Sequence, residues 1–239
     1  MGVPMNNILK NKSLLLFDLD ETIYDHQFSS LAGLNAVARK FPLWQKQSLE
    51  YLENIYFKEL HAIYLKVIDG QISDNDAHII RFQKLAQQCQ LQFSTNEFEE
   101  MIQLYTQASR QEKRSIPDAP EAIFQLKKLG YSIAIITNGA TDHQKQKIKL
   151  CGIHNHIDFA LISEEVGIRK PSKEIFEKAM SIAKVKPENT LMVGDSWDSD
   201  ILGAQAAKIQ PIWINRGRHQ NYSPLDVMEI KHIKQLLNS

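Results

Sequence analysis

Hydrophobic residues are arranged in two different ways along this chain of 239 residues. Between residues 28 and 114 they recur every three or four positions, which is the spacing of one buried face of an α-helix. After Pro117 and Pro120, short apolar runs alternate with amphipathic segments, a pattern typical of strands and helices in a parallel sheet. One earlier apolar run, SLLLF at 13–17, also indicates a buried strand. We therefore expect the helical region to be inserted between the first strand and the rest of a sheet.

The helical region predicts about four helices. The first covers 31–41 and the second 49–67, each with an apolar stripe on one face. The polar segment SDND at 73–76 is typical of a helix start, and STNE at 94–97 has the pattern of a capping box. We expect an all-α helical-bundle domain over residues 26–114, and an α/β domain made of residues 1–25 and 115–239.

The α/β part predicts a doubly wound parallel sheet. Its further strands are YSIAIIT (131–137), DFALIS (158–163), TLMVGD (190–195) and PIWIN (211–215), with a helix expected between each pair. This regular alternation indicates a Rossmann-like α/β fold covered by helices on both faces.

Composition and charge exclude several classes of function. The chain is 43% hydrophobic and 23% charged, as expected for a folded globular protein. Basic and acidic residues both number 28, so a nucleic-acid polymer is not an expected partner. No apolar run approaches the ~20 residues of a membrane span, and no signal peptide is evident. Two distant cysteines predict no disulfide framework. We expect a cytoplasmic protein without a membrane partner.

Distinctive polar residues follow the predicted strands. Parallel strands bring their carboxyl ends to one edge of a sheet, so these residues are expected to line one crevice. They are Asp18, Asp20, Thr137, Asn138, Lys170, Asp195 and Asp200. Clustered carboxylates suit Mg²⁺, and a hydroxyl, an amide and a lysine suit phosphate oxygens. An aspartate nucleophile, a metal and a lysine are groups that phosphoryl transfer uses.

Four segments that carry these residues resemble the motifs of the haloacid dehalogenase-like (HAD) hydrolases. In order they are DLDET (18–22), ITNG (136–139), RKP (169–171) and VGDSWDSD (193–200). The inserted helical region looks like the α-helical cap domain of that superfamily. Within it, the chain most resembles the noncanonical pyrimidine nucleotidase branch, which dephosphorylates nucleoside monophosphates.

The resemblance implies a role for each residue. Asp18 is the expected nucleophile that forms an aspartyl-phosphate, and Asp20 the expected general acid and base. Thr137, Lys170 and the backbone amide of Asn138 are expected to hold the phosphoryl group. Mg²⁺ is expected at Asp18, at the backbone carbonyl of Asp20 and at Asp195. Asp200 is the expected support of that metal site.

The expected activity is Mg²⁺-dependent phosphomonoester hydrolysis on a small phosphometabolite such as a nucleoside 5′-monophosphate. Alternative activities for the same fold and site residues are those of a phosphomutase and of a sugar-phosphate or phosphoglycolate phosphatase. A 2-haloacid dehalogenase needs neither Asp20 nor Asp195, and a receiver-like phospho-acceptor module lacks the helical insertion. The physiological substrate, the specificity residues of the cap and the oligomeric state stay open.

Other polar residues near the motifs are expected to be structural. Glu21 and Asp198 are predicted to be solvated, although the choice between Asp198 and Asp200 as second acidic residue of the metal site stays open. HQKQKIK at 143–149 is predicted to be an exposed helix face.

Overall fold

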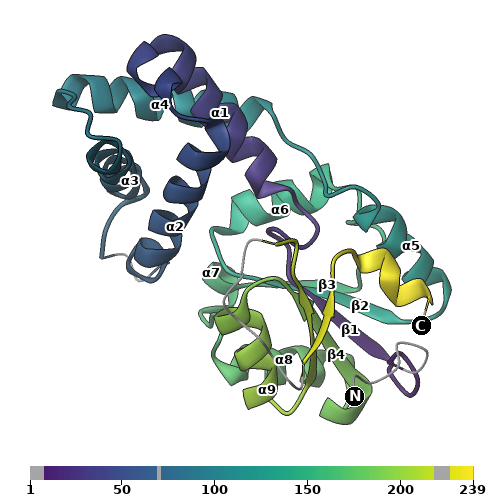
Figure 1. Ribbon diagram of the computed structural model, residues 1–239. Helices are drawn as coiled ribbons and strands as arrows, with labels where there is room; N and C mark the ends of the chain where they lie inside the picture. The colour runs from purple at the N-terminus through teal and green to yellow at the C-terminus, as the bar shows by residue number, and fades with distance from the viewer. Residues whose placement is uncertain (1–7, 69–70, 218–226, 239) are drawn as a thin grey trace. The chain divides into compact units, whose positions relative to one another are not determined.

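The computed structural model describes residues 8–68, 71–217 and 227–238. These residues form two compact units (Figure 1). The first unit contains Met1–Asp25 and Arg114–Ser239, and the second contains His26–Lys113. The second unit is therefore an insertion into the first, between its first strand and the remainder of its sheet.

A six-stranded parallel sheet organises the first unit, with the strand order β3-β2-β1-β4-β5-β6. The strands are β1 (Leu14–Phe17), β2 (Ser132–Thr137), β3 (Phe159–Ile162), β4 (Thr190–Gly194), β5 (Gln210–Ile214) and β6 (Met228–Ile230). The inserted region leaves β1 next to β2 and β4, in the middle of the sheet. This confirms the predicted α/β class and the parallel sheet. The last strand, β6, was not predicted because three residues are too short for a recognisable pattern.

Both faces of the sheet are covered, because alternate residues of each strand point to opposite sides. Leu15 and Phe17 of β1 pack with α5 and α6, whereas Leu14 and Leu16 pack with α8 and α9. The helices of this unit are α5 (Ala119–Lys128), α6 (Thr141–Leu150), α7 (Ser163–Val166), α8 (Lys173–Ala183) and α9 (Leu202–Ala206), with the shorter turns η3 (Pro187–Asn189), η4 (Trp197–Ile201) and η5 (Ile233–Asn238).

Among the described residues of the second unit, four helices surround their own hydrophobic core. They are α1 (His26–Lys40), α2 (Leu49–Ile68), α3 (Asp74–Gln88) and α4 (Thr95–Gln111), with the turn η2 (Pro42–Lys46) after α1. Ser73 caps α3, and Ser94 with Glu97 forms the predicted capping box of α4. The first helix begins five residues earlier than its apolar spacing predicts, because its first turn is polar.

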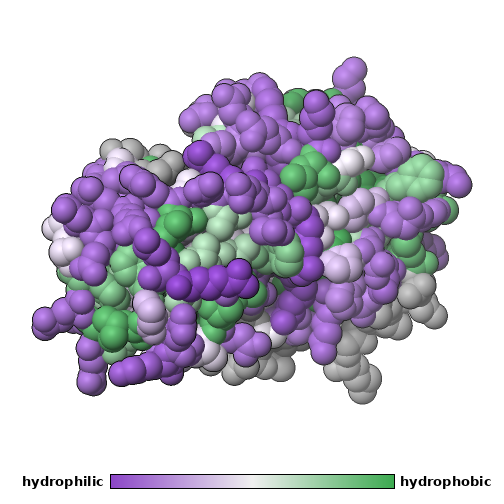
Figure 2. Space-filling view, turned by 90° about the horizontal axis from the view of Figure 1, so that it is seen from above, coloured by the Kyte–Doolittle hydropathy of each residue, from purple (hydrophilic) through white to green (hydrophobic). Residues whose placement is uncertain are grey.

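The surface is largely hydrophilic on the face that Figure 2 shows, with smaller hydrophobic areas between the polar residues. Six large hydrophobic side chains are exposed among the described residues: Leu43, Tyr51, Leu129, Leu150, Ile182 and Leu202. None of the described helices has both the length and the hydropathy that a membrane span requires.

Candidate active site

A buried lysine joins two of the aspartates at the carboxyl end of the sheet. Asp18 directly follows β1, and its main-chain N–H donates to the Val193 carbonyl of β4. The Lys170 Nζ atom lies 2.6 Å from Asp18 Oδ1 and 2.6 Å from Asp200 Oδ1. All three side chains are buried, so these ion pairs have little water to weaken them.

Asp200 is held in place from both of its carboxylate oxygens. Oδ1 accepts from Lys170, and Oδ2 accepts from the main-chain N–H of Ser196 at 3.0 Å. Its carboxylate also lies directly against Gly194, where an added Cβ would be 2.3 Å from Oδ2. A side chain at position 194 would therefore displace Asp200, so glycine is needed there for packing.

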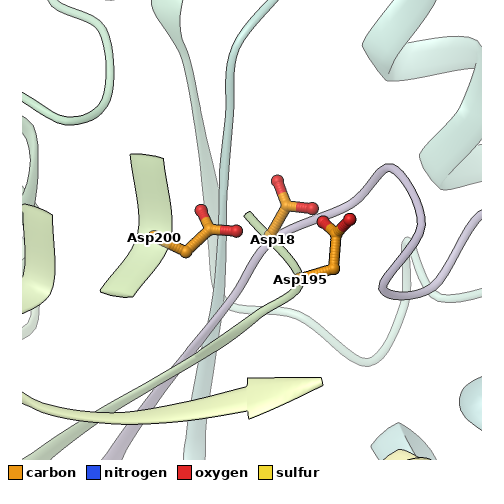
Figure 3. A group of neighbouring side chains, drawn as sticks. All are labelled: Asp18, Asp195 and Asp200. Carbon is orange, nitrogen blue, oxygen red and sulfur yellow. The ribbon is translucent and has the colours of Figure 1, made fainter. Parts of the chain in front are cut away.

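Three carboxylates gather at this point of the sheet (Figure 3). One oxygen from each of Asp18, Asp195 and Asp200 lies within 4.8 Å of the others. Asp195 follows β4, and its main-chain carbonyl accepts a hydrogen bond from Trp213 Nε1 at 2.8 Å, which ties this turn to β5. Three aspartates with one lysine leave an excess of negative charge when all are ionised.

Burial and the neighbouring charges shift the pKa values of the cluster. Burial raises the pKa of Asp18 to about 7, although Lys170 acts in the opposite direction. Desolvation, followed by the carboxylates of Asp18 and Asp200, raises the pKa of Asp195 well above its usual range. Burial alone would lower the pKa of Lys170, but Asp18 and Asp200 more than offset this and raise it. Lys170 is therefore a permanent cation, and the carboxylates around it still lack positive charge.

A hard divalent cation fits this set of groups. The available ligands are carboxylate oxygens, which Mg²⁺ prefers, and a second positive charge near Asp18 and Asp195 would offset their mutual repulsion. Because both oxygens of Asp200 already have protein donors, Asp18 and Asp195 are the better ligands and Asp200 the better support.

Thr137 and Asn138 lie at the end of β2, as predicted from their place after a strand. The side chain of Asn138 binds the main chain of Lys170: Oδ1 accepts from its N–H at 2.9 Å, and Nδ2 donates to its carbonyl at 3.0 Å. The Asn138 side chain thus fixes the segment that carries Lys170. This leaves the backbone amide of Asn138, rather than its side chain, as its group for a phosphate.

Two residues of α6 contact Asp20, and the sequence interpretation missed both. Gln144 Nε2 donates to Asp20 Oδ2 at 2.9 Å and to Thr137 Oγ1, while Lys147 Nζ lies 2.7 Å from Asp20 Oδ1. Gln144 is only 1% exposed, although this segment was predicted to be an exposed helix face. A signal was present: Gln144, Ile148 and Cys151 are four and three residues apart, so they share the buried side of the helix.

The prediction for Glu21 was also wrong. Glu21 is buried, and Arg216 Nη2 lies 2.7 Å from both its Oε2 atom and its carbonyl oxygen. The DLDET segment turns back towards the sheet at this point, since Glu21 N–H donates to the Tyr24 carbonyl. Asp198 is exposed on η4, whereas Asp200 faces Lys170 from the same turn. The geometry therefore favours Asp200 over Asp198 as the second acidic residue of the site.

These features define an α/β protein with a lysine and a cluster of carboxylates at the carboxyl end of its parallel sheet, and comparison with known proteins identifies the family. The model of the haloacid dehalogenase-like hydrolases matches residues 12–208. The chain belongs to this family of hydrolases, which confirms the resemblance inferred from its four motifs.

Individual relatives cover almost the whole chain. A glyceraldehyde 3-phosphate phosphatase of Methanothermobacter thermautotrophicus is 30% identical over 233 residues, which are 93% of this chain and 96% of the relative. The pyrimidine 5′-nucleotidase YjjG of Escherichia coli is 28% identical over 236 residues, again 93% and 96% of the two chains. Among solved structures, the HAD-hydrolase YfnB of Bacillus subtilis, bound to magnesium, has a TM-score of 0.73 at 23% identity and covers 95% of this chain and 97% of its own, which shows a shared fold.

Proposed function

We propose that this protein is a Mg²⁺-dependent phosphomonoester hydrolase that works through an aspartyl-phosphate on Asp18. The observation that carries the proposal is the buried Asp18–Lys170–Asp200 cluster with Asp195 beside it. A dehalogenase needs a nucleophilic aspartate but not a second carboxylate at position 20 or one at position 195, so the extra acidic groups favour phosphoryl transfer.

In the first step, a carboxylate oxygen of Asp18 attacks phosphorus and the ester P–O bond breaks. Asp20 gives its proton to the leaving oxygen. Gln144 and Lys147 hold the Asp20 carboxylate from both of its oxygens, and Gln144 also contacts Thr137, so one side chain links the acid to the expected phosphate-binding hydroxyl. The Lys170 ammonium group and the Thr137 hydroxyl stabilise the negative charge of the phosphoryl group.

In the second step, Asp20 removes a proton from water, and the resulting oxygen attacks the phosphorus of the aspartyl-phosphate. The bond between phosphorus and Asp18 breaks, inorganic phosphate leaves, and Asp18 is restored as a carboxylate. Lys170 stays paired with Asp200 throughout, so it keeps its position when Asp18 is esterified and no longer carries a charge.

Asp18, Asp195 and the backbone carbonyl of Asp20 are the groups that would hold Mg²⁺. The bound ion would offset the charge of the carboxylates and of the phosphate oxygens. The raised pKa of Asp18 supports this assignment, because a nucleophile must be ionised and nearby positive charge favours its ionised form.

The proposed substrate is a small phosphorylated metabolite. The relatives are named for glyceraldehyde 3-phosphate and for pyrimidine nucleotides, so these two types of ester, with phosphoglycolate and sugar phosphates, form the first panel. A phosphomutase would use the same residues, and release of inorganic phosphate in the steady state separates hydrolysis from it. The cytoplasmic location stays a prediction.

The test measures phosphate release over this panel with Mg²⁺ and with excess EDTA. We expect turnover of at least one ester that needs Mg²⁺ and that disappears in Asp18→Asn. The exposed neighbour gives a matched control, since Asp198→Asn removes an acidic group from the same turn as Asp200 without touching Lys170. Turnover that is equal with and without metal would overturn the metal assignment, and an active Asp18→Asn, with deamidation excluded by mass spectrometry, would overturn the nucleophile.

A further inference from the structure

A buried arginine lies in the helical unit without a carboxylate beside it. Arg81 of α3 is 5% exposed, and its guanidinium carbon lies 4.4 Å from the ring centre of Tyr56. Nε donates to the Ala77 carbonyl at 3.2 Å, and Nη2 donates to His78 Nδ1 at 2.9 Å. These contacts use two of its five N–H groups, and within the described residues the other three have no recorded acceptor.

Such an arrangement is unusual for a buried cation. An arginine cannot lose its proton in a protein, so it must keep its charge inside the fold. Lys170, the other basic side chain in the buried set, faces two carboxylates. No acidic side chain of the described part of the chain forms an ion pair with Arg81. Its positive charge is therefore offset only by a π face, a carbonyl and an imidazole.

The imidazole beside Arg81 is a second hydrogen-bond donor. Since arginine only donates, His78 Nδ1 accepts from it, and the ring proton lies on Nε2. Tyr56 Oη also lies 2.7 Å from Nδ1, which fixes the ring. Burial, then Arg81, His26 and Arg110, lower the pKa of His78 to about 3, so the ring is neutral near pH 7. In the structure as described, no group is recorded as a partner of Nε2, and the ring is half-buried.

The residues around Arg81 and His78 carry positive charge and are held in place by packing. Within the described residues, the charged groups that act on His78 are basic, namely Arg81, His26 and Arg110. Tyr105 packs on both Tyr56 and His78, with ring centres 4.8 Å and 5.4 Å apart, and its hydroxyl donates to Ser30 at 3.1 Å. Side chains from α1, α2, α3 and α4 therefore hold one guanidinium and one N–H donor in place.

We propose that Arg81 and His78 form a binding site for an oxyanion, a carboxylate or phosphate group, within the helical unit. The remaining guanidinium N–H groups and His78 Nε2–H are its donors. The buried carboxylate of this unit, Glu53, accepts from Gln27, and no contact of the described residues pairs it with Arg81, so the anion supplies the negative charge at Arg81. Two sources have this chemistry: inorganic phosphate and a small carboxylic acid.

The first experiment observes the site directly in the full chain. The ring signals of His78, assigned with His78→Gln, are followed by NMR while inorganic phosphate and, separately, succinate are added. We expect a saturable shift that is weakened about tenfold or more in Arg81→Met, since one charge-assisted hydrogen bond is lost. Arg81→Lys should retain part of the affinity.

The matched control is Arg39→Met, which removes an exposed arginine from the same unit and should leave the titration unchanged. If Arg81→Met does not fold, the titration of the wild type still decides whether an anion binds beside His78. A His78 shift that is absent or does not saturate with either anion overturns the site, and so does an unchanged shift in a folded Arg81→Met.

The second experiment separates the two sources by comparing the two NMR titrations. If inorganic phosphate is the ligand, it saturates the His78 shift at a concentration at least tenfold lower than succinate does. If a carboxylic acid is the ligand, succinate saturates the shift at the lower concentration.

Discussion

The two units each bury a charged cluster, and the clusters have opposite signs. In the α/β unit Lys170 pairs with Asp18 and Asp200, and one oxygen from each of these and from Asp195 lies within 4.8 Å of the others. In the helical unit Arg81 lies beside His78 and Tyr56, and no carboxylate of the described residues forms an ion pair with it. Buried charge is costly unless it is compensated, so an incomplete balance indicates a missing partner. This reasoning supports the proposed cation at the first cluster and the proposed anion at the second.

The largest effect is expected from Asp18, because it is both the proposed nucleophile and part of the charge excess. Asp18→Asn should abolish turnover, since an amide is a poor nucleophile and a poor Mg²⁺ ligand. In EDTA it should also raise the melting temperature, because it removes a buried like charge beside Asp195. Kinetics and thermal unfolding on the same samples, with Asp198→Asn as control, measure both. A lower melting temperature would mean that the cluster is balanced without a metal.

The second largest effect concerns Asp20. Asp20→Asn should slow hydrolysis of alkyl phosphates by roughly 10²–10⁴, the usual contribution of a positioned acid or base. The leaving group of p-nitrophenyl phosphate needs no proton, so its first step should be slowed far less than its second. Rapid-quench kinetics should then reveal a burst of nitrophenol with phosphate trapped on Asp18. Equal slowing of both esters without a burst would leave Asp20 as a structural carboxylate.

The contrast between the units also explains what the sequence could predict. β1 is a short apolar run that ends in DLDET, and in a parallel sheet such an end meets the ends of the neighbouring strands. The juxtaposition of Asp18, Lys170 and Asp195 therefore follows from order along the chain. No comparable rule predicts a site from the apolar face of a helix, so Arg81 was not predicted as a functional residue.

A weaker signal was nevertheless present in both units. Ala77, Arg81 and Leu85 are four residues apart and all buried, so Arg81 occupies the buried side of α3. Gln144 occupies the corresponding position on α6, ahead of Ile148. Polar residues on a stripe that is otherwise apolar are thus candidates for function. The apolar neighbours Ile79 and Ile80 are half-buried and thus less deeply buried than Arg81.

A substitution of Gln144 tests this idea, and its expected effect is intermediate in size. Gln144→Ala removes the side chain that joins Asp20 to Thr137, and we expect kcat for an alkyl phosphate to fall about tenfold, the value of one hydrogen bond of this type. The loss should be smaller for the first step with p-nitrophenyl phosphate, because the effect acts through the acid. Gln146→Ala, on the exposed side of the same helix, is the matched control. A loss that is the same for both leaving groups would assign Gln144 to packing.

The smallest effect is expected in stability, and it tests the positive cluster alone. The folded state holds the pKa of His78 at about 3, because the ring is buried and faces Arg81, His26 and Arg110. In the unfolded chain its pKa returns to about 6.5, so between these two pKa values the unfolded state binds a proton that the folded state does not bind. Stability from this group is complete above pH 6.5 and is lost as the pH falls towards 3.

Urea unfolding of the wild type and His78→Gln at pH 7.5 and pH 4.5 measures this term. We expect the wild type to lose about 2 kcal/mol more than the variant over this interval, after allowance for solvent contact of the half-buried ring. His154→Gln, which changes an exposed histidine of the other unit, should behave as the wild type. Succinate should reduce the difference, since an anion beside Nε2–H favours the protonated ring in the folded state. Equal pH dependence in the wild type and His78→Gln would mean that the neighbours of His78 are already balanced, and the contrast between the two clusters would then be lost.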